Sequence, residues 1–188
     1  MKLKATLLLS VVLASAAFAS GQNKAPHTLR EFFNLLSQKY FYLESIYVDN
    51  PSPAWLKRAR KEYLETFLKI EDENNGYMEG SGDGSQEHFK LALFRRSNGT
   101  YIVGLNVFGE WGDKYYFLEY KNGRLQDVSR KIVPGYRKSN MYMFPRYGTT
   151  TAVISRKNYN AEDEVGETGN KLYDLVWKND RFRIMGRR

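Results

Sequence analysis

The chain has 188 residues and carries 29 Lys and Arg against 21 Asp and Glu, which gives a formal net charge of +8, and it has no Cys. Without Cys, both a disulfide framework and a lipid anchor on an N-terminal Cys are excluded. Only two His are present, so the usual transition-metal ligand sets are thin, and we expect neither a metal nor a cofactor.

The first nineteen residues have the three parts of a secretory signal peptide. Lys2 and Lys4 form a basic start, a largely apolar run follows, and residues 17–19 match the A-x-A cleavage motif. We therefore expect cleavage before Ser20 and export to the periplasm or the medium. Removing 19 of the 188 residues leaves 169, a suitable length for one domain (20–188), and lowers the formal charge to +6. No later stretch approaches the roughly 20 apolar residues of a membrane-spanning helix.

Two helices are predicted at the start of the mature chain. Thr28 and Glu31 have the spacing of a capping box, and apolar residues continue at helical spacing to about Tyr47. Pro53 suits the first turn of a second helix, which we expect to run to about Ile70.

An acidic, turn-prone segment follows at residues 71–76 and resembles the beginning of a calcium loop. Glu71, Glu73 and Asn75 occupy the first, third and fifth positions of such a loop. Gly82, however, stands where a bidentate Glu is required, so the pattern disfavours a calcium site.

Residues 88–128 read as four consecutive antiparallel strands, with turns at Asn98-Gly99, at residues 109–112 and at Asn122-Gly123. A two-residue turn at Asn98-Gly99 would place Phe94 opposite Val103. Both faces of these strands are partly apolar, so we expect the helices to cover one face and the rest of the sheet to pack on the other. A glycine within a strand, Gly104, would let another group approach the backbone closely.

The last third of the chain is less regular. It predicts an irregular crossing at residues 133–136, short strands near 141–144 and 149–154, and an exposed acidic loop at 158–169. A final hairpin turns at Asn179-Asp180 and places Trp177 opposite Phe182 and Leu175 opposite Ile184.

Two of the predicted hairpins share a sequence pattern. Residues 120–125 and 177–182 both read aromatic, Lys, Asn, Gly or Asp, Arg, apolar. The pattern is explained either by an internal repeat or by independent use of a favoured turn, and one matched pair does not establish a repeat period.

Together these elements predict an α+β fold: two N-terminal helices packed on a bent antiparallel β-meander of about 7–9 strands. The stretch 89–129, with residues 144–150 and 171–177, resembles small exported bacterial proteins of unknown function, and the likeness runs from about Phe32. The resemblance implies export and a single β-rich domain, and it assigns no catalytic or binding residue.

The most suggestive surface is the turn between the second and third strands of the meander. Glu110, Trp111, Asp113 and Tyr115 together could bind a sugar, with the indole stacking on the ring and the carboxylates accepting hydrogen bonds. The alternative is that Trp111 folds back over the sheet edge or under a helix and the carboxylates are merely solvated. A rival function is glycan hydrolysis by a carboxylate pair among Glu110, Asp113 and Glu119.

The positive charge favours acidic polysaccharide or an anionic envelope surface as partner, and nucleic acid is not expected for an exported protein. Basic clusters at residues 57–61, 95–96 and 181–188 are separated in sequence, as ordinary solvated faces would be. No nucleophile elbow, phosphate loop or zinc-protease motif occurs. We therefore expect an exported, non-enzymatic binding module for an acidic or glycan ligand.

Overall fold

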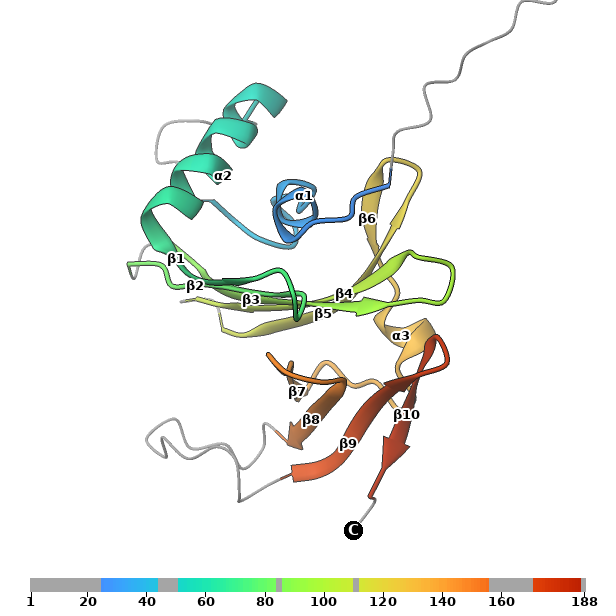
Figure 1. Cartoon of the computed structure of the whole chain (residues 1–188). Coiled ribbons are helices and arrows are strands. Elements are labelled where there is room, and N and C mark those ends of the chain that lie inside the picture. The colour runs from blue at the N-terminus through green and yellow to red at the C-terminus, as the bar shows by residue number, and fades with distance from the viewer. Residues whose placement is uncertain (1–24, 44–50, 84–85, 110–111, 156–170, 187–188) are drawn as a thin grey trace, which may run out of the picture.

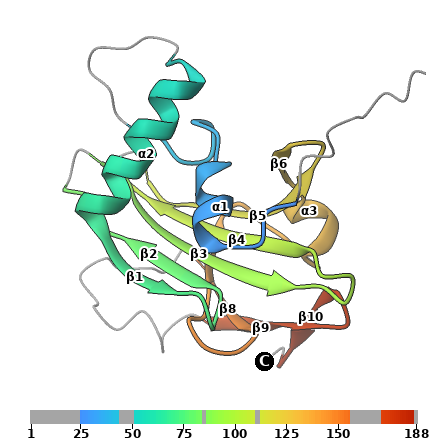
Figure 2. The same ribbon diagram turned by 45° about the horizontal axis from the view of Figure 1, so that its top comes forward.

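The computed structural model describes residues 25–43, 51–83, 86–109, 112–155 and 171–186, which form an α+β fold of three layers (Figure 1). Two helices cover one face of a six-stranded antiparallel sheet, and a four-stranded sheet packs against its other face (Figures 1 and 2). The predicted α+β class is confirmed. The single meander of about 7–9 strands is replaced by two sheets of six and four strands. The predicted signal peptide, residues 1–19, lies outside the described residues.

The six-stranded sheet follows the chain order from one edge to the other. Its strands are β1 (Leu68–Asp72), β2 (Tyr77–Gly80), β3 (His88–Arg95), β4 (Tyr101–Phe108), β5 (Lys114–Lys121) and β6 (Arg124–Asp127). The four strands expected in residues 88–128 are confirmed. β1 and β2 were not expected, and the acidic segment forms the turn between them, where Gly76 has a φ of 64°.

The predicted pairing of β3 with β4 is wrong by one residue. Phe94 lies opposite Ile102, and Arg95 lies opposite Tyr101. The connecting loop is longer than two residues because Arg96 donates its N–H to the carbonyl of Thr100 at 2.8 Å. Gly99 takes the left-handed conformation, with a φ of 80°, as in three-residue hairpin loops that end in a bulge.

The four-stranded sheet has the order β10-β9-β8-β7. Its strands are β7 (Asn140–Met143), β8 (Thr150–Ser155), β9 (Lys171–Lys178) and β10 (Arg181–Met185). A short helix, α3 (Ser129–Ile132), precedes the predicted irregular crossing between the two sheets. The last hairpin has the predicted register, with Trp177 opposite Phe182, and the predicted loop 158–169 lies outside the described residues.

The helices begin as predicted and end earlier. In α1 (Leu29–Asn34) the capping box of Thr28 and Glu31 is present, and α2 (Pro53–Phe67) has Pro53 in its first turn. α1 does not continue towards Tyr47, because the Gln38 side chain binds both the N–H and the carbonyl of Leu43 and closes a loop there. α2 ends three residues before Ile70, where β1 has already begun.

Two aromatic-rich cores hold the layers together. One lies between the helices and the large sheet, and the other lies between the two sheets. In the second core, Gly104 lies against the ring of Phe144, and a Cβ at Gly104 would lie only 2.6 Å from that ring. The close approach expected at this glycine is thereby confirmed. As expected, both faces of the strands in residues 88–128 are covered, one by the helices and the other by the four-stranded sheet.

Candidate ligand-binding site

The turn predicted to bind a ligand connects β4 to β5. Its two central residues, Glu110 and Trp111, lie outside the described residues, and their roles stay predictions. The two flanking glycines are joined by a hydrogen bond of 2.9 Å from the N–H of Gly112 to the carbonyl of Gly109. Gly112 has a φ of 86°, a conformation that glycine adopts without steric cost.

Tyr115, the last residue of the predicted site, lies in the core between the sheets. It is only 5% exposed, and its ring centroid lies 6.1 Å from that of Tyr142. Its hydroxyl donates a long hydrogen bond, 3.5 Å, to the carboxylate of Asp113, which is half-buried at the end of the turn. The Tyr115 ring therefore contributes to packing, and its hydroxyl helps to position Asp113.

Of the carboxylates of the predicted hydrolase site, Glu119 lies on β5 and Asp113 directly precedes that strand. Glu119 forms an ion pair with Arg96 near the end of that strand. Asp113 precedes Glu119 by six residues of extended chain, which separates their Cα atoms by about 20 Å. Glycoside hydrolysis requires carboxyl groups about 5–9.5 Å apart, so these two do not form such a pair. Pairings with Glu110 lie outside the described residues.

Glu87 lies beside the turn and was not singled out from the sequence. It is 7% exposed, accepts the N–H of Tyr42 at 2.7 Å and forms an ion pair with Lys114 at 3.0 Å. A Cβ at Gly109 would lie 3.1 Å from the Glu87 side chain, so Gly109 packs directly on Glu87. Because a buried carboxylate needs such partners, Glu87 links β5 to the residues that follow α1.

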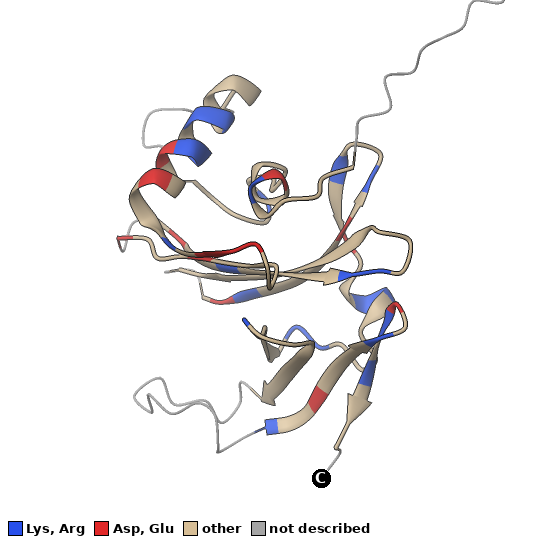
Figure 3. Ribbon diagram, in the orientation of Figure 1, with Lys and Arg blue, Asp and Glu red and all other residues tan. Residues whose placement is uncertain are grey.

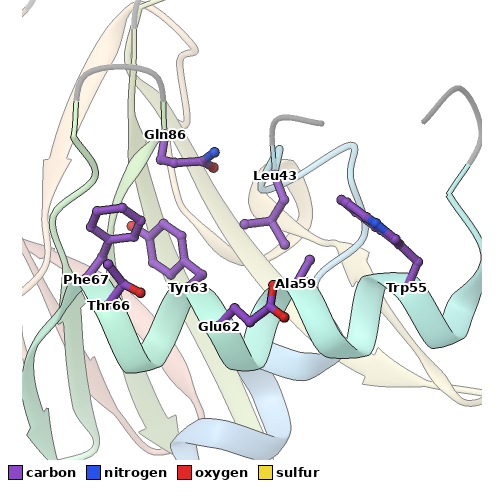
Figure 4. A pocket seen from close by; sticks show the side chains of 8 residues that line it. All are labelled: Leu43, Trp55, Ala59, Glu62, Tyr63, Thr66, Phe67 and Gln86. Carbon is purple, nitrogen blue, oxygen red and sulfur yellow. The ribbon is translucent and has the colours of Figure 1, made fainter. Parts of the chain in front are cut away.

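The residue before Glu87 lines a hollow of about 200 Å³ between α2 and the residues that follow α1 (Figure 4). Its apolar lining consists of Leu43, Trp55, Ala59, Tyr63 and Phe67, and its polar lining of Glu62, Thr66 and Gln86. Sites that enclose drug-sized ligands have about 300–1,000 Å³. The hollow therefore suits a single ring or the end of a chain.

The polar lining of the hollow includes two acceptor oxygens, one on Gln86 and one on Glu62. The side-chain oxygen of Gln86 is buried and accepts no hydrogen bond from the described residues. Figure 4 shows the Gln86 carboxamide extending towards Leu43 across the hollow. Within the described part of the chain, the exposed carboxylate of Glu62 forms one ion pair, of 3.7 Å, with Arg58, one turn away on α2. A ligand that donates hydrogen bonds would match both oxygens.

Tyr63 forms a fixed wall of the hollow. Its hydroxyl donates to the backbone carbonyl of Glu87 at 2.7 Å, and its ring centroid lies 5.1 Å from that of Phe67. Burial, reinforced by the charge of Glu87, raises the pKa of Tyr63 above its ordinary value. The phenol therefore stays protonated at neutral pH, and we assign it a positioning role.

The sequence contained a signal for this hollow. Trp55, Ala59, Glu62 and Thr66 are spaced by four, three and four residues, so they share one face of α2. That face mixes an indole with polar groups. A face that only packs on the core is more uniformly apolar. Gln86 has no such signal, because only the tertiary fold brings it to α2.

Within the described ranges, no group of three or more His, Cys, Asp or Glu side chains is arranged to hold a metal ion. No helix in these same ranges combines the length and the apolar character needed to cross a bilayer. Comparisons of the chain with protein-family models, with curated proteins and with solved structures found no match. Its function therefore rests on the chemistry of its own residues.

Proposed function

We propose that the protein is an exported, non-enzymatic binding module and that the hollow beside α2 holds a sugar ring of a glycan. The observation that carries this proposal is the buried oxygen of Gln86, which has no donor from the described residues and stands among aromatic side chains. A buried acceptor without a partner costs about 1–3 kcal/mol. A ligand hydroxyl that donates to Gln86 would remove that cost.

The charge at the hollow favours a neutral glycan over an acidic ligand. The Glu62 carboxylate lines the hollow and would repel a second carboxylate or a phosphate, whereas a sugar hydroxyl can donate to it. Thr66 adds a hydroxyl that can both donate and accept. Of the two ligand classes expected from the sequence, the glycan fits this hollow better.

The aromatic side chains supply the second half of the recognition. Trp55 and Phe67 stand at opposite ends of the hollow, and both are partly exposed (Figure 4). Aromatic faces contribute apolar area to a contact, and an indole adds a polar edge. The apolar face of a sugar ring could therefore stack on Trp55 while its hydroxyls reach Gln86 and Glu62. Export, proposed from residues 1–19, would give the hollow access to envelope and extracellular glycans.

The test is a glycan-binding screen followed by affinity measurements on variants. Trp55→Ala and Gln86→Leu should each weaken a retained glycan by about tenfold, the equivalent of about 1.4 kcal/mol for one stacking contact or one hydrogen bond. Tyr147→Ala is the matched control, because Tyr147 is an aromatic residue that is 66% exposed and lies outside the hollow. Equal losses in all three variants, or no glycan retained by the wild type, would reject the proposal.

A further inference from the structure

Three hairpin tips lie at one end of the molecule, on the right in Figures 1 and 2. They are the β3–β4, β5–β6 and β9–β10 turns. The first and third are joined by a hydrogen bond of 2.8 Å from the Ser97 N–H to Asp180 and by one of 2.8 Å from the Trp177 indole to the carbonyl of Arg95. The first and second belong to the same sheet, in which Ile102 lies opposite Glu119.

These tips carry a concentration of positive charge (Figure 3). Five exposed cations lie on them: Arg95, Lys121, Arg124, Lys178 and Arg181. Within the described residues, none of the five forms an ion pair. Two carboxylates at the same end already have partners. Glu119 pairs with Arg96, and Asp180 accepts hydrogen bonds from Ser97. The basic clusters that are separated in sequence are therefore partly gathered by the fold.

Two of the tips place like charges directly opposite each other. Lys121 faces Arg124, and Lys178 faces Arg181. Such cross-strand pairs are unfavourable. The requirement for positive φ explains why both turns contain Asn followed by Gly or Asp, since all four central residues have φ between 52° and 80°. It does not explain why a Lys precedes each turn and an Arg follows it, so turn geometry alone does not account for the shared sequence pattern.

We propose that this basic end, defined by the five cations of the three tips, docks on the anionic headgroups of a lipid bilayer. The cations stand on three separate hairpin tips at the same end of the molecule, so they can meet an extended anionic surface at the same time. The unfavourable pairs would be relieved there, because each Lys or Arg gains attraction to the surface charge. The inference is independent of any glycan in the hollow beside α2.

The test is co-sedimentation of the purified protein with phosphatidylcholine vesicles that contain or lack phosphatidylglycerol. Each cation near an anionic surface changes the partition coefficient by about fivefold, so Lys121→Gln/Arg124→Gln and Lys178→Gln/Arg181→Gln should each lower it by about 25-fold. The matched control is Arg58→Gln/Lys61→Gln, which removes the same net charge from exposed positions on α2. All variants have the same N-terminal sequence, so a difference in vesicle binding between them can be assigned to the substituted positions.

Selective loss in the two hairpin variants, with thermal stability not lowered and binding abolished at high salt, would support the proposal. An equal loss in the α2 control would show a response to net charge alone and overturn it. So would absence of binding to the anionic vesicles. Retention on an acidic polysaccharide resin without vesicle binding would also overturn it and reassign the basic end to a polysaccharide.

Discussion

Replacing Gly104 by Ala tests how tightly the two sheets are packed. Gly104 lies in the middle of β4, and the added Cβ would lie 2.6 Å from the nearest carbon of the Phe144 ring. Ordinary contact begins at 3.4 Å, so the ring would have to withdraw by about 0.8 Å. It has little room to do so, because its centroid already lies 5.1 Å from that of Phe117 and 6.1 Å from that of Phe94.

The expected magnitude combines two opposing effects. Overpacking a well-filled core costs about 1–3 kcal/mol. Replacing Gly by Ala at an ordinary φ returns about 0.4–1 kcal/mol by reducing the freedom of the unfolded chain. We therefore expect Gly104→Ala to lower the free energy of unfolding by about 1–2 kcal/mol, measured by urea denaturation with an unchanged m-value.

A double-mutant cycle assigns the loss to one contact. In a Phe144→Leu background the ring is absent, so Gly104→Ala should cost nothing or stabilise slightly, which gives a coupling energy of about 1 kcal/mol or more. Additive effects of Gly104→Ala and Phe144→Leu would refute the packing argument. So would a stabilised Gly104→Ala variant in the wild-type background.

Three further predictions follow from single sites. Trp177→Ala should lower the free energy of unfolding by about 3–5 kcal/mol, because Trp177 is only 8% exposed. An unchanged midpoint of urea denaturation would contradict its burial. Thr151→Val should raise the free energy of unfolding by about 1 kcal/mol, because the buried Thr151 hydroxyl has no hydrogen-bond partner among the described residues. Thr150→Val at the exposed neighbour should change it by less than about 0.5 kcal/mol. Hydrogen bonds to the Glu31 carboxylate, first of all from the backbone N–H of His27, lower the pKa of Glu31 below its ordinary value. The ionised Glu31 side chain therefore stabilises the folded protein at pH values above the pKa that Glu31 has in the unfolded chain. This contribution is lost as the pH falls through the pKa of Glu31 in the folded protein. Glu31→Gln should therefore flatten the acid limb of a plot of unfolding free energy against pH.

Local chemistry was sufficient for the hairpins whose turns require positive φ at both central residues. Asn122-Gly123 and Asn179-Asp180 both have this geometry, and both registers follow from it. Asn98-Gly99 looks alike in sequence, but only the glycine takes positive φ, and the loop gains a residue. The dipeptide predicts a turn in each case, while the loop length depends on a hydrogen bond between Arg96 and Thr100.

The parts that could not be predicted depend on contacts between distant segments. Apolar spacing suggested a helix through Tyr40 and Leu43, yet these residues reach the core from a loop closed by Gln38. A periodic pattern records which side chains are buried and does not record the backbone that buries them. The hollow beside α2 could not be predicted in full for the same reason, because its walls come from α2, Leu43 and Gln86, which only the tertiary fold brings together.

The two proposed surfaces occupy different ends of the molecule, and this placement has a consequence for their use. α2 lies on the left of both ribbon views, whereas the three basic hairpin tips lie on the right. A protein docked through its tips would therefore present the hollow beside α2 away from the bilayer, where a glycan could enter. The two activities should then be additive: tip variants should keep the affinity for a glycan, and Trp55→Ala should keep the affinity for anionic vesicles. Loss of both activities in one variant would mean that a single surface serves both ligands.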